Sequence, residues 1–368
     1  MLYNGVMISS VYIHIPFCNR KCNYCSFVSY DTLTLKNVYI DSLLKEIRSN
    51  YNFEPLDTLY FGGGTPSILS TSDFKQIFDL LNLKNAAEIT VEINPETVNK
   101  EYLAELKSLG VNRLSIGVQA FDDKILKAIG RNHTVLDVEK TVKNAKNVGF
   151  ENISIDLIYG LPSQDLKSLE KTLQKAINLD AQHISLYGLK IEEGCHFYNN
   201  KPDFLPDNDE QAQMYIESIK TLMTSGFEHY EISNFAQKGY ESKHNLKYWH
   251  NENYYGFGVA ACGYENGVRY NNQTSIEKYL QNPNLKISKD TLTFEEKLEE
   301  EIFLGFRLLK GIDVGFINQK YSIDFEDKYK QIIDKYTETG HLTATEKGYK
   351  LSLNGILLSN NILSEFID

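Results

Sequence analysis

Three cysteines stand within eight residues near the start of the chain, in the segment YIHIPFCNRKCNYCSF. Cys18, Cys22 and Cys25 form a C-x3-C-x2-C pattern directly after a short apolar segment with the composition of a strand. Cubane iron–sulfur clusters are normally held by four thiolates. Three thiolates on one tight loop therefore hold three irons and leave the fourth open to another ligand. The spacing predicts a [4Fe–4S] cluster with one open corner.

Other uses of these cysteines fit the pattern less well. Zinc sites usually pair their ligands across a dozen or more residues, and no second pair follows at that distance. Disulfides are rare in the cytosol, and the total of five cysteines is odd. Cys195 and Cys262 are interpreted as structural thiols, although a role for Cys262 as a second soft ligand stays open.

The first two thirds of the chain alternate short apolar segments with segments of helical spacing. Six strands rich in Ile, Val or Leu, as expected of strands covered on both faces, are predicted at residues 11–16, 56–61, 88–94, 113–119, 152–158 and 183–189. Helices are predicted between them at residues 35–49, 72–81, 99–109, 135–148 and 165–179. This alternation predicts a parallel sheet with right-handed crossovers. The expected fold class is α/β, with a partial (β/α)6 barrel of the TIM type.

The pattern changes after about residue 235, where aromatic residues and glycines mix. Helices are predicted at residues 294–309 and 325–339, followed by two alternating segments about a glycine turn and a last helical stretch. A helix followed by a hairpin suggests a winged-helix-like module. We therefore expect a domain at residues 1–235 and a smaller, mainly helical domain at residues 236–368.

Composition limits the class of function. The formal net charge of -11, without any run of Lys or Arg, argues against a nucleic-acid partner. No stretch approaches the roughly 18 apolar residues of a spanning helix. The first residues lack the cationic start of a signal peptide. A cytoplasmic location is expected, while peripheral membrane contact and a homodimer stay open.

Glycine and acidic residues follow the second and third predicted strands. Gly63, Gly64 and Thr65 end the second strand, and glycines let backbone groups come close to a ligand. Glu92 ends the third strand, where a carboxylate can accept charge-assisted hydrogen bonds. Chemistry in such folds gathers at these strand ends. A permissive loop and a structural acid are the alternatives.

Three more polar residues belong to the same edge of the predicted sheet. Gln119 ends the fourth strand with an amide that both donates and accepts. Arg131 suits a bidentate contact with a carboxylate. Asp156 lies inside an apolar strand, where an unpaired carboxylate costs free energy. A structural salt bridge is the alternative for each, above all for Arg131.

Together these residues resemble the radical S-adenosylmethionine superfamily, whose signature is the C-x3-C-x2-C loop. From Tyr12 to about residue 189 the chain is similar to the coproporphyrinogen-oxidase-like branch. The resemblance implies that the open iron chelates the amino and carboxylate groups of S-adenosylmethionine, whose sulfonium an electron from the cluster cleaves to a 5′-deoxyadenosyl radical. It implies the following contacts with S-adenosylmethionine: Tyr12, Tyr24, Gly63, Gly64, Thr65, Glu92, Gln119, Arg131 and Asp156.

The segment HNLKYW, within KHNLKYWHNENYYGFG, resembles the H-N-x-x-Y-W element of the HemW heme chaperone family. The tail also resembles the C-terminal region of that family. The resemblance implies that heme is bound by His244, Asn245, Tyr248 and Trp249. Imidazole is a common axial ligand of heme iron, and aromatic rings pack on the porphyrin. The alternative is that His244 and Trp249 fill the interface between the two parts of the chain.

Two departures separate the chain from the oxygen-independent coproporphyrinogen III oxidases. Those enzymes carry a fourth cysteine as C-x-C, where this chain has Phe27. They also carry a long N-terminal arm, whereas 17 residues precede Cys18 here. Both differences argue against a decarboxylating oxidase.

The leading hypothesis is a heme chaperone with a [4Fe–4S] cluster, S-adenosylmethionine and heme as cofactors. Its expected partners are heme, a heme-accepting protein and an electron donor for the cluster. The second hypothesis is a radical oxidoreductase acting on a porphyrin, so enzymatic activity stays open. A nucleic-acid-binding module in the winged tail is the least favoured.

Overall fold

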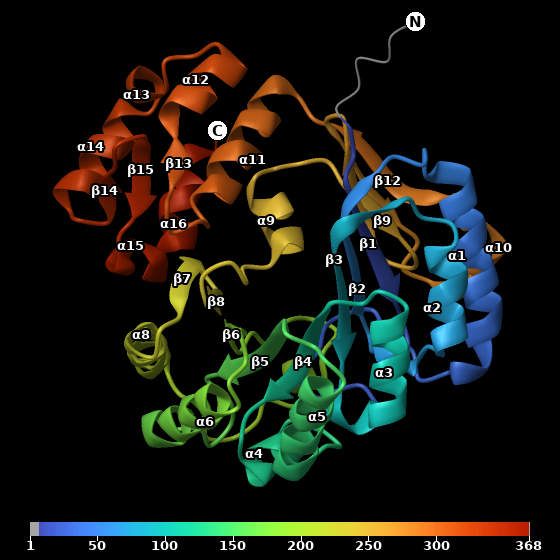
Figure 1. Cartoon of the computed structure of the whole chain (residues 1–368). Helices are drawn as coiled ribbons and strands as arrows, with labels where there is room; N and C mark the ends of the chain where they lie inside the picture. The colour runs from blue at the N-terminus through green and yellow to red at the C-terminus, as the bar shows by residue number, and fades with distance from the viewer. Residues whose placement is uncertain (1–6, 368) are drawn as a thin grey trace, which may run out of the picture.

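A nine-stranded sheet forms the core of the computed structural model, which describes residues 7–367 (Figure 1). Six parallel strands lie side by side in chain order: β1 (Ser10–Ile15), β2 (Leu56–Gly63), β3 (Leu83–Ile93), β4 (Arg113–Gln119), β5 (Ile153–Tyr159) and β6 (His183–Gly188). Each crossover advances by one strand in the same direction, which is the winding of a (β/α) barrel. The strand order is open among the described residues. The predicted α/β fold with a partial barrel is confirmed.

Helices cover the outer face of this sheet (Figure 1). Several begin at side-chain caps; Thr134 and Asp165, for example, accept backbone N–H bonds at the starts of α5 and α6. The predicted helices lie within three residues of observed ones, and α4 is additional. Their bounds are α1 (Lys36–Asn50), α2 (Thr71–Phe78), α3 (Lys100–Ser108), α4 (Asp123–Ala128), α5 (Val135–Asn147) and α6 (Leu166–Asn178).

The edges of the sheet are made by later segments of the chain. After α7 (His196–Asn199) and α8 (Asn208–Thr224), β7 (Glu228–Glu231) and β8 (Asn234–Ala236) add antiparallel strands beside β6. At the other edge, β9 (Tyr255–Phe257) pairs in parallel with β1. Because β9 follows residue 235, the large sheet does not end at the predicted domain boundary. The division into residues 1–235 and 236–368 stays a prediction.

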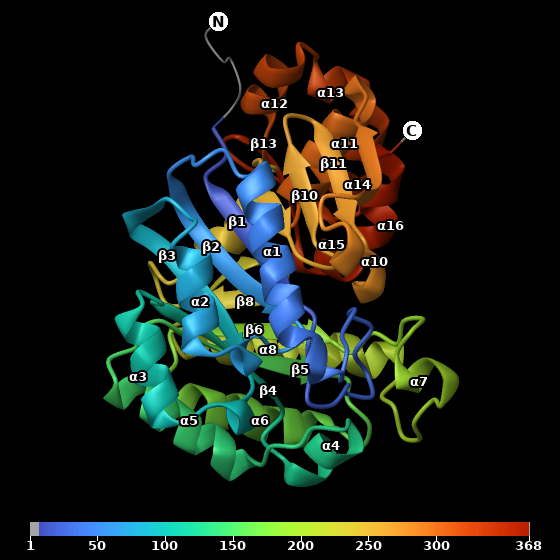
Figure 2. The same ribbon diagram turned by 90° about the vertical axis from the view of Figure 1, so that its right-hand side faces the viewer.

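A second, smaller sheet packs beside the barrel (Figure 2). It is antiparallel and contains β10 (Cys262–Glu265), β11 (Val268–Asn272) and β12 (Lys286–Thr291), with α10 (Ile276–Gln281) between the last two. The short α9 (Lys243–Trp249) precedes it and lies between the barrel and the C-terminal elements. None of these elements was predicted from the sequence, because short segments rich in aromatic residues and glycine show no clear period.

The C-terminal part has the helix and hairpin expected of a winged-helix-like module. Its elements are α11 (Phe294–Gly305), β13 (Ile312–Asp313), α12 (Val314–Tyr321), α13 (Phe325–Lys328), α14 (Lys330–Glu338), β14 (Leu342–Ala344), β15 (Gly348–Leu351), α15 (Leu353–Leu357) and α16 (Ser359–Leu363). The three strands form one antiparallel sheet. The predicted helix at residues 325–339 is broken at Tyr329, and that at residues 294–309 ends at Gly305.

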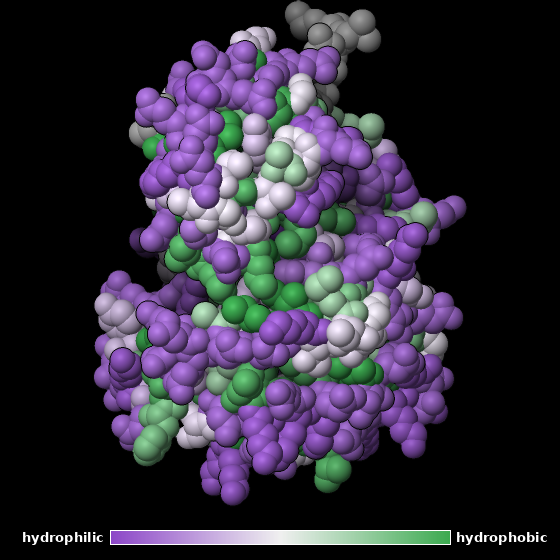
Figure 3. All heavy atoms as spheres, turned by 90° about the vertical axis from the view of Figure 1, so that its left-hand side faces the viewer, coloured by the Kyte–Doolittle hydropathy of each residue, from purple (hydrophilic) through white to green (hydrophobic). Residues whose placement is uncertain are grey.

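Hydrophobic side chains gather across the middle of one face, between the C-terminal elements and the barrel (Figure 3). None of the helices within residues 7–367 is long and apolar enough to cross a membrane.

Glu46 on α1 connects the barrel to the smaller sheet. Its carboxylate is fully buried and accepts hydrogen bonds from the backbone N–H of Gly258 (2.8 Å), from Asn272 Nδ2 (2.8 Å) and from the Tyr279 hydroxyl (2.7 Å). Lys286 Nζ lies 2.7 Å away and supplies the opposite charge. All four partners follow residue 255, so one carboxylate holds residues 258–286 against α1.

We predict that Glu46→Ala destabilises the fold by about 3–5 kcal/mol, because it leaves the buried end of Lys286 and several donors without a partner. Denaturant unfolding of the full chain measures this change. The control is Asp79→Ala, which breaks an exposed ion pair with Lys75 and should cost less than about 1 kcal/mol. Equal, small effects of the two substitutions would contradict this role for Glu46.

Candidate functional site

The cysteine loop leaves β1 and is fixed by backbone hydrogen bonds at both sides. Cys18 N–H donates to Tyr30 O (3.0 Å), and Asn23 N–H donates to Ile129 O (3.0 Å) beyond α4. At the exit of β1, Gly64 N–H donates to Ile15 O (2.8 Å). The thiols of the three cysteines are free and half-buried. The loop therefore presents Cys18, Cys22 and Cys25 from a backbone fixed against the barrel.

A chain of hydrogen bonds connects two of the thiols beneath the loop. Thr65 Oγ1 lies 3.4 Å from Cys18 Sγ and accepts from Asn94 Nδ2 at 3.1 Å. Arg131 donates through Nη2 to Asn94 Oδ1 (2.7 Å) and through Nη1 towards Cys22 Sγ (3.5 Å). Thr65 and Arg131, both predicted site residues, thus meet at the cysteine loop. Asn94 was not predicted, although its position two residues after Glu92 at a strand end was a usable signal.

The electrostatics of the loop fit a cationic metal cluster. Burial raises the pKa of Cys25 to about 11 and also raises that of Cys18. A bare thiolate is therefore disfavoured there unless a positive charge compensates it. In residues 7–367, no three His, Cys, Asp or Glu side chains converge as ligands of a single ion.

The glycine segment after β2 packs directly on the cysteine loop. A Cβ on Gly64 would lie 2.6 Å from Phe17 O and 2.9 Å from Ile15 O. Gly63 has φ +107°, and a Cβ there would meet the His14 ring at 2.7 Å. Side chains at either position would displace the loop or the β1 exit. These glycines are required by packing, and their contact with S-adenosylmethionine stays a proposal.

Glu92 and two tyrosines lie together inside the barrel. The Tyr60 hydroxyl donates to Glu92 Oε1 at 2.8 Å, and the Tyr12 ring stacks near that of Tyr60 at 6.2 Å. Burial raises the pKa of Glu92 to about 7, although the bond from Tyr60 acts in the opposite direction. Tyr60 was not predicted as a site residue. A carboxylate with such a pKa can respond to a ligand near neutral pH.

The other residues predicted to contact S-adenosylmethionine lie in different parts of the structure. Gln119 is buried with φ +69°, where β4 and β5 change register. The Asp156 carboxylate accepts from Ser115 Oγ (2.8 Å) and Ser154 Oγ (3.1 Å), and burial raises its pKa. Tyr24 hydrogen-bonds with the Cys22 thiol, and burial raises its pKa. Asp156 is therefore paired inside the barrel, whereas Tyr24 belongs to the cysteine loop.

His244 on α9 faces into the barrel and is almost fully buried. Its Nδ1 is 2.8 Å from Thr58 Oγ1, and its Nε2 is 2.8 Å from the Tyr248 hydroxyl. Burial lowers the pKa of His244 to about 3, so the ring is neutral. Both ring nitrogens are used by protein groups in this conformation. His244 therefore packs between α9 and the barrel, as expected under the alternative that it fills an interface.

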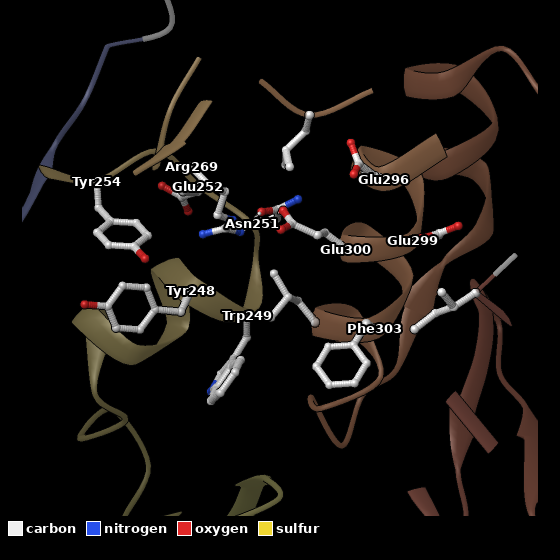
Figure 4. Close-up of a pocket in the computed structure, with 13 residues that line it drawn as sticks. Tyr248, Trp249, Asn251, Glu252, Tyr254, Arg269, Glu296, Glu299, Glu300 and Phe303 are labelled. Atoms are coloured by element: carbon white, nitrogen blue, oxygen red, sulfur yellow. Dashed lines mark hydrogen bonds and ion pairs between the residues drawn. The ribbon is translucent and has the colours of Figure 1, made fainter. Parts of the chain in front are cut away.

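The other residues of the predicted heme segment face different surroundings. Tyr248 and Trp249 line a pocket of about 650 Å³ between α9 and α11. Figure 4 shows Phe303 on α11 opposite Trp249, with the Tyr248 hydroxyl directed away from Trp249. The backbone N–H of Asn245 donates a helix-capping hydrogen bond to Ser242 Oγ, and the Asn245 side chain is half-buried. His244 and Asn245 do not line the pocket.

The charge of this pocket is mainly acidic. Four glutamates and one arginine line it: Glu252, Glu296, Glu299, Glu300 and Arg269. Arg269 forms a bidentate pair with Glu300, with both contacts at 2.8 Å. The guanidinium of Arg307 lies over the Trp249 ring, 4.7 Å from the ring centre. The pocket therefore has an aromatic wall and an acidic wall.

Comparison with known proteins identifies the family of this chain. The radical SAM superfamily model matches residues 12–176, and the HemN C-terminal domain model matches residues 292–358. The chain is 39% identical to the heme chaperone HemW of Bacillus subtilis, over 98% of this chain and 99% of that protein. It is 38% identical to HemW of Lactococcus lactis, over 98% of this chain and 97% of that protein. The chain belongs to the HemW family.

Other similarities agree with this membership. HemW of Escherichia coli is 33% identical over 97% of this chain and 98% of that protein. Among solved structures, coproporphyrinogen III oxidase HemN from Escherichia coli, a radical SAM enzyme, superposes with a TM-score of 0.88. The superposition covers 98% of this chain and 90% of the HemN chain, at 24% sequence identity, which shows a shared fold. Radical SAM membership gives the HemW-family chain a [4Fe–4S] cluster and S-adenosylmethionine as cofactors.

We predict that Gly64→Ala lowers the iron and sulfide content of the anaerobically reconstituted protein by more than about half, because a Cβ collides with the loop backbone. Chemical iron and sulfide analysis measures the loss. The control is Gly315→Ala, whose Cβ would approach no atom closer than 3.4 Å. A full cluster content in both variants would rule out this packing requirement.

We predict that S-adenosylmethionine binds more tightly as pH rises through about 7, by up to about tenfold per pH unit below the pKa. Glu92 has its pKa raised to about 7, so it is neutral at lower pH and ionised above. The N–H and hydroxyl donors of the ligand prefer the ionised carboxylate. Equilibrium dialysis from acidic to alkaline pH measures the trend. Glu92→Gln should remove it, and a flat wild-type profile would contradict the assignment.

Proposed function

We propose that this protein is a heme chaperone, which binds heme and passes it to an acceptor protein. The observation that carries the proposal is the near-complete overlap with several proteins named heme chaperone HemW, at 33–39% identity in bacteria as different as Bacillus subtilis and Escherichia coli. Related chains that match over their whole length share both the barrel and the C-terminal region. The function is therefore proposed for the whole chain.

The pocket between α9 and α11 supports heme binding beside the HNLKYW segment. Its volume of about 650 Å³ is that of a small-molecule site. Trp249, Tyr248 and Phe303 offer flat apolar surfaces on which a porphyrin can pack. We propose that the ring enters between the two helices with its carboxylates pointing away from the acidic wall, because like charges repel.

Iron ligation by His244 requires a local rearrangement. Tyr248 lines the pocket, and its hydroxyl hydrogen-bonds with His244 Nε2. When the Tyr248 hydroxyl leaves, Nε2 becomes free while Nδ1 keeps its bond to Thr58. A histidine held through one nitrogen can present the other to a metal. We propose that heme binding opens the bond between Tyr248 and His244.

The residues gathered at the cysteine loop support the cofactor side of the proposal. Cys18, Cys22 and Cys25 would hold the cluster, with Thr65 and Arg131 hydrogen-bonded at its base. Glu92 would accept from the bound S-adenosylmethionine. The remaining predicted contacts, Tyr12, Tyr24, Gly63, Gly64, Gln119 and Asp156, are proposed on the family resemblance.

Partners and location are part of the same proposal. A heme acceptor and an electron donor for the cluster are expected, and a homodimer and peripheral membrane contact stay open. All five cysteines are free thiols. Unpaired thiols accord with a reducing compartment, which supports the proposed cytoplasmic location. The domain boundary at residue 235 is likewise proposed.

A porphyrin oxidase remains the second reading and has less support. Phe27 replaces the fourth cysteine expected of those oxidases, and its side chain is 66% exposed beside the cysteine loop. The likeness to the HemN oxidase at 24% identity concerns the fold. The chaperone reading rests on higher identity over the whole chain.

Heme titration tests the proposed function. We predict that wild type binds heme with the optical spectrum of a histidine ligand, and that His244→Ala loses this spectrum and about tenfold or more of its affinity, which corresponds to about 1.4 kcal/mol. Trp249→Ala should weaken binding while keeping the spectrum, because it removes only a packing surface. The measurement is the Soret band during titration.

His341→Ala is the matched control, since His341 lies in the C-terminal part and its ring contacts Thr339. Its titration should equal that of wild type. An unchanged spectrum in His244→Ala would remove this histidine from the model, and no binding by wild type would refute the chaperone proposal.

A further inference from the structure

The inward faces of β2 and β3 form a continuous row of side chains along the barrel. Side chains two residues apart share one face of a strand. The parallel register sets Thr58 beside Glu88 and Tyr60 beside Thr90. The row consists of Thr58, Tyr60 and Gly62 on β2 and of Glu88, Thr90 and Glu92 on β3. It runs from the amino ends of the strands to their carboxyl ends, where the cysteine loop lies.

At the carboxyl end, Tyr60 is bound to the proposed S-adenosylmethionine site. Its hydroxyl donates to Glu92 Oε1 at 2.8 Å. Gly62 makes room for this contact, because a Cβ there would lie 3.0 Å from Glu92 Oε1 and 3.1 Å from the rings of Tyr12 and Tyr60. Glu92, Tyr60 and Tyr12 are therefore packed so closely that a shift of one side chain displaces the others.

At the amino end, the same row holds α9. The backbone N–H groups of Lys243 and His244 both donate to the Glu88 carboxylate at 3.1 Å. The His244 ring stacks on the Tyr60 ring, with centres 5.1 Å apart and planes 28° apart. It is also bonded to Thr58. Tyr60 thus touches Glu92 with its hydroxyl and His244 with its ring.

We infer that Tyr60 is a positioning residue that couples occupancy of the S-adenosylmethionine site to the docking of α9, so that S-adenosylmethionine weakens heme binding. A ligand that fixes Glu92 also fixes the Tyr60 hydroxyl, and an ordered Tyr60 ring favours the stacked position of His244. A His244 ring ordered in this position keeps its hydrogen bond with Tyr248, one turn further along α9, whereas heme ligation requires the Tyr248 hydroxyl to leave Nε2. The two ligands therefore favour opposite states of this bond, and each weakens the other by the same factor.

This inference rests on the proposed heme function for its direction, and one experiment separates the two. Heme is titrated into the reconstituted holoprotein with and without saturating S-adenosylmethionine, and the Soret band is followed. In wild type, S-adenosylmethionine should raise the heme concentration at half-saturation about fivefold or more, and in Tyr60→Phe less than about twofold. Tyr60→Phe keeps the ring and loses the bond to Glu92.

The matched control is Tyr102→Phe on α3, which removes a tyrosine hydroxyl that donates to Leu69 O. It should behave as wild type. When wild type binds heme, an equal shift in Tyr60→Phe and wild type, or no shift in wild type, overturns the coupling through Tyr60.

A second readout does not depend on heme. Hydrogen exchange of the amides of residues 243–249 should slow when S-adenosylmethionine binds to wild type and stay unchanged in Tyr60→Phe. Thr58→Val removes the hydroxyl that is bonded to His244 Nδ1. Like Tyr60→Phe, it should show no change in exchange when S-adenosylmethionine binds. If wild type binds no heme but its exchange responds, the proposed function fails and the coupling stands. If the exchange of wild type does not respond, the coupling is overturned.

Discussion

The structure depends first on the contact between the exit of β1 and the glycine end of β2. Gly64 N–H donates to Ile15 O, and its missing Cβ leaves room for the backbone of Phe17, immediately before Cys18. This contact fixes the starting point and direction of the cysteine loop. Thr65, next in sequence, then reaches the first thiol. A three-cysteine motif alone gives ligands, and the strand contact gives them a fixed place at the barrel mouth.

The barrel interior carries polar side chains where many barrels carry layers of branched apolar ones. Arg113, Glu88 and His183 are buried in this region. Glu92, Asp156 and His183 are hydrogen-bonded to hydroxyl groups there. Buried polar groups are tolerated only when they are paired. The interior is thus set up to receive polar ligands at one end and α9 at the other. Tyr60 connects the two ends directly.

Much of the fold could be predicted because its signals are local. Apolar segments such as residues 113–119 and capped helices such as α5 and α6 carry their period and their caps in sequence. The strands β7 to β12 escaped prediction, since three- to six-residue segments are fixed by their partners rather than by their own pattern. The break of the last long helix at Tyr329 also depends on packing around Phe325 and Phe366.

The candidate site could be predicted only in part. The cysteines, Thr65, Glu92 and Arg131 follow strands or loops whose geometry brings them to one edge. Asn94 and Tyr60 were missed because their roles come from contacts across strands. The burial of His244 also could not be read from HNLKYW, since Thr58 is 186 residues away in sequence. Long-range pairs of this kind become visible only in the folded chain.

The central claim is a cluster with one iron open to S-adenosylmethionine. Electron paramagnetic resonance of the anaerobically reconstituted and reduced protein, recorded with and without S-adenosylmethionine, tests it most directly. The account predicts a [4Fe–4S] signal whose g values change when the ligand is added, since the ligand joins the open iron. A signal that is identical in both samples, or no cluster signal at all, would contradict the account.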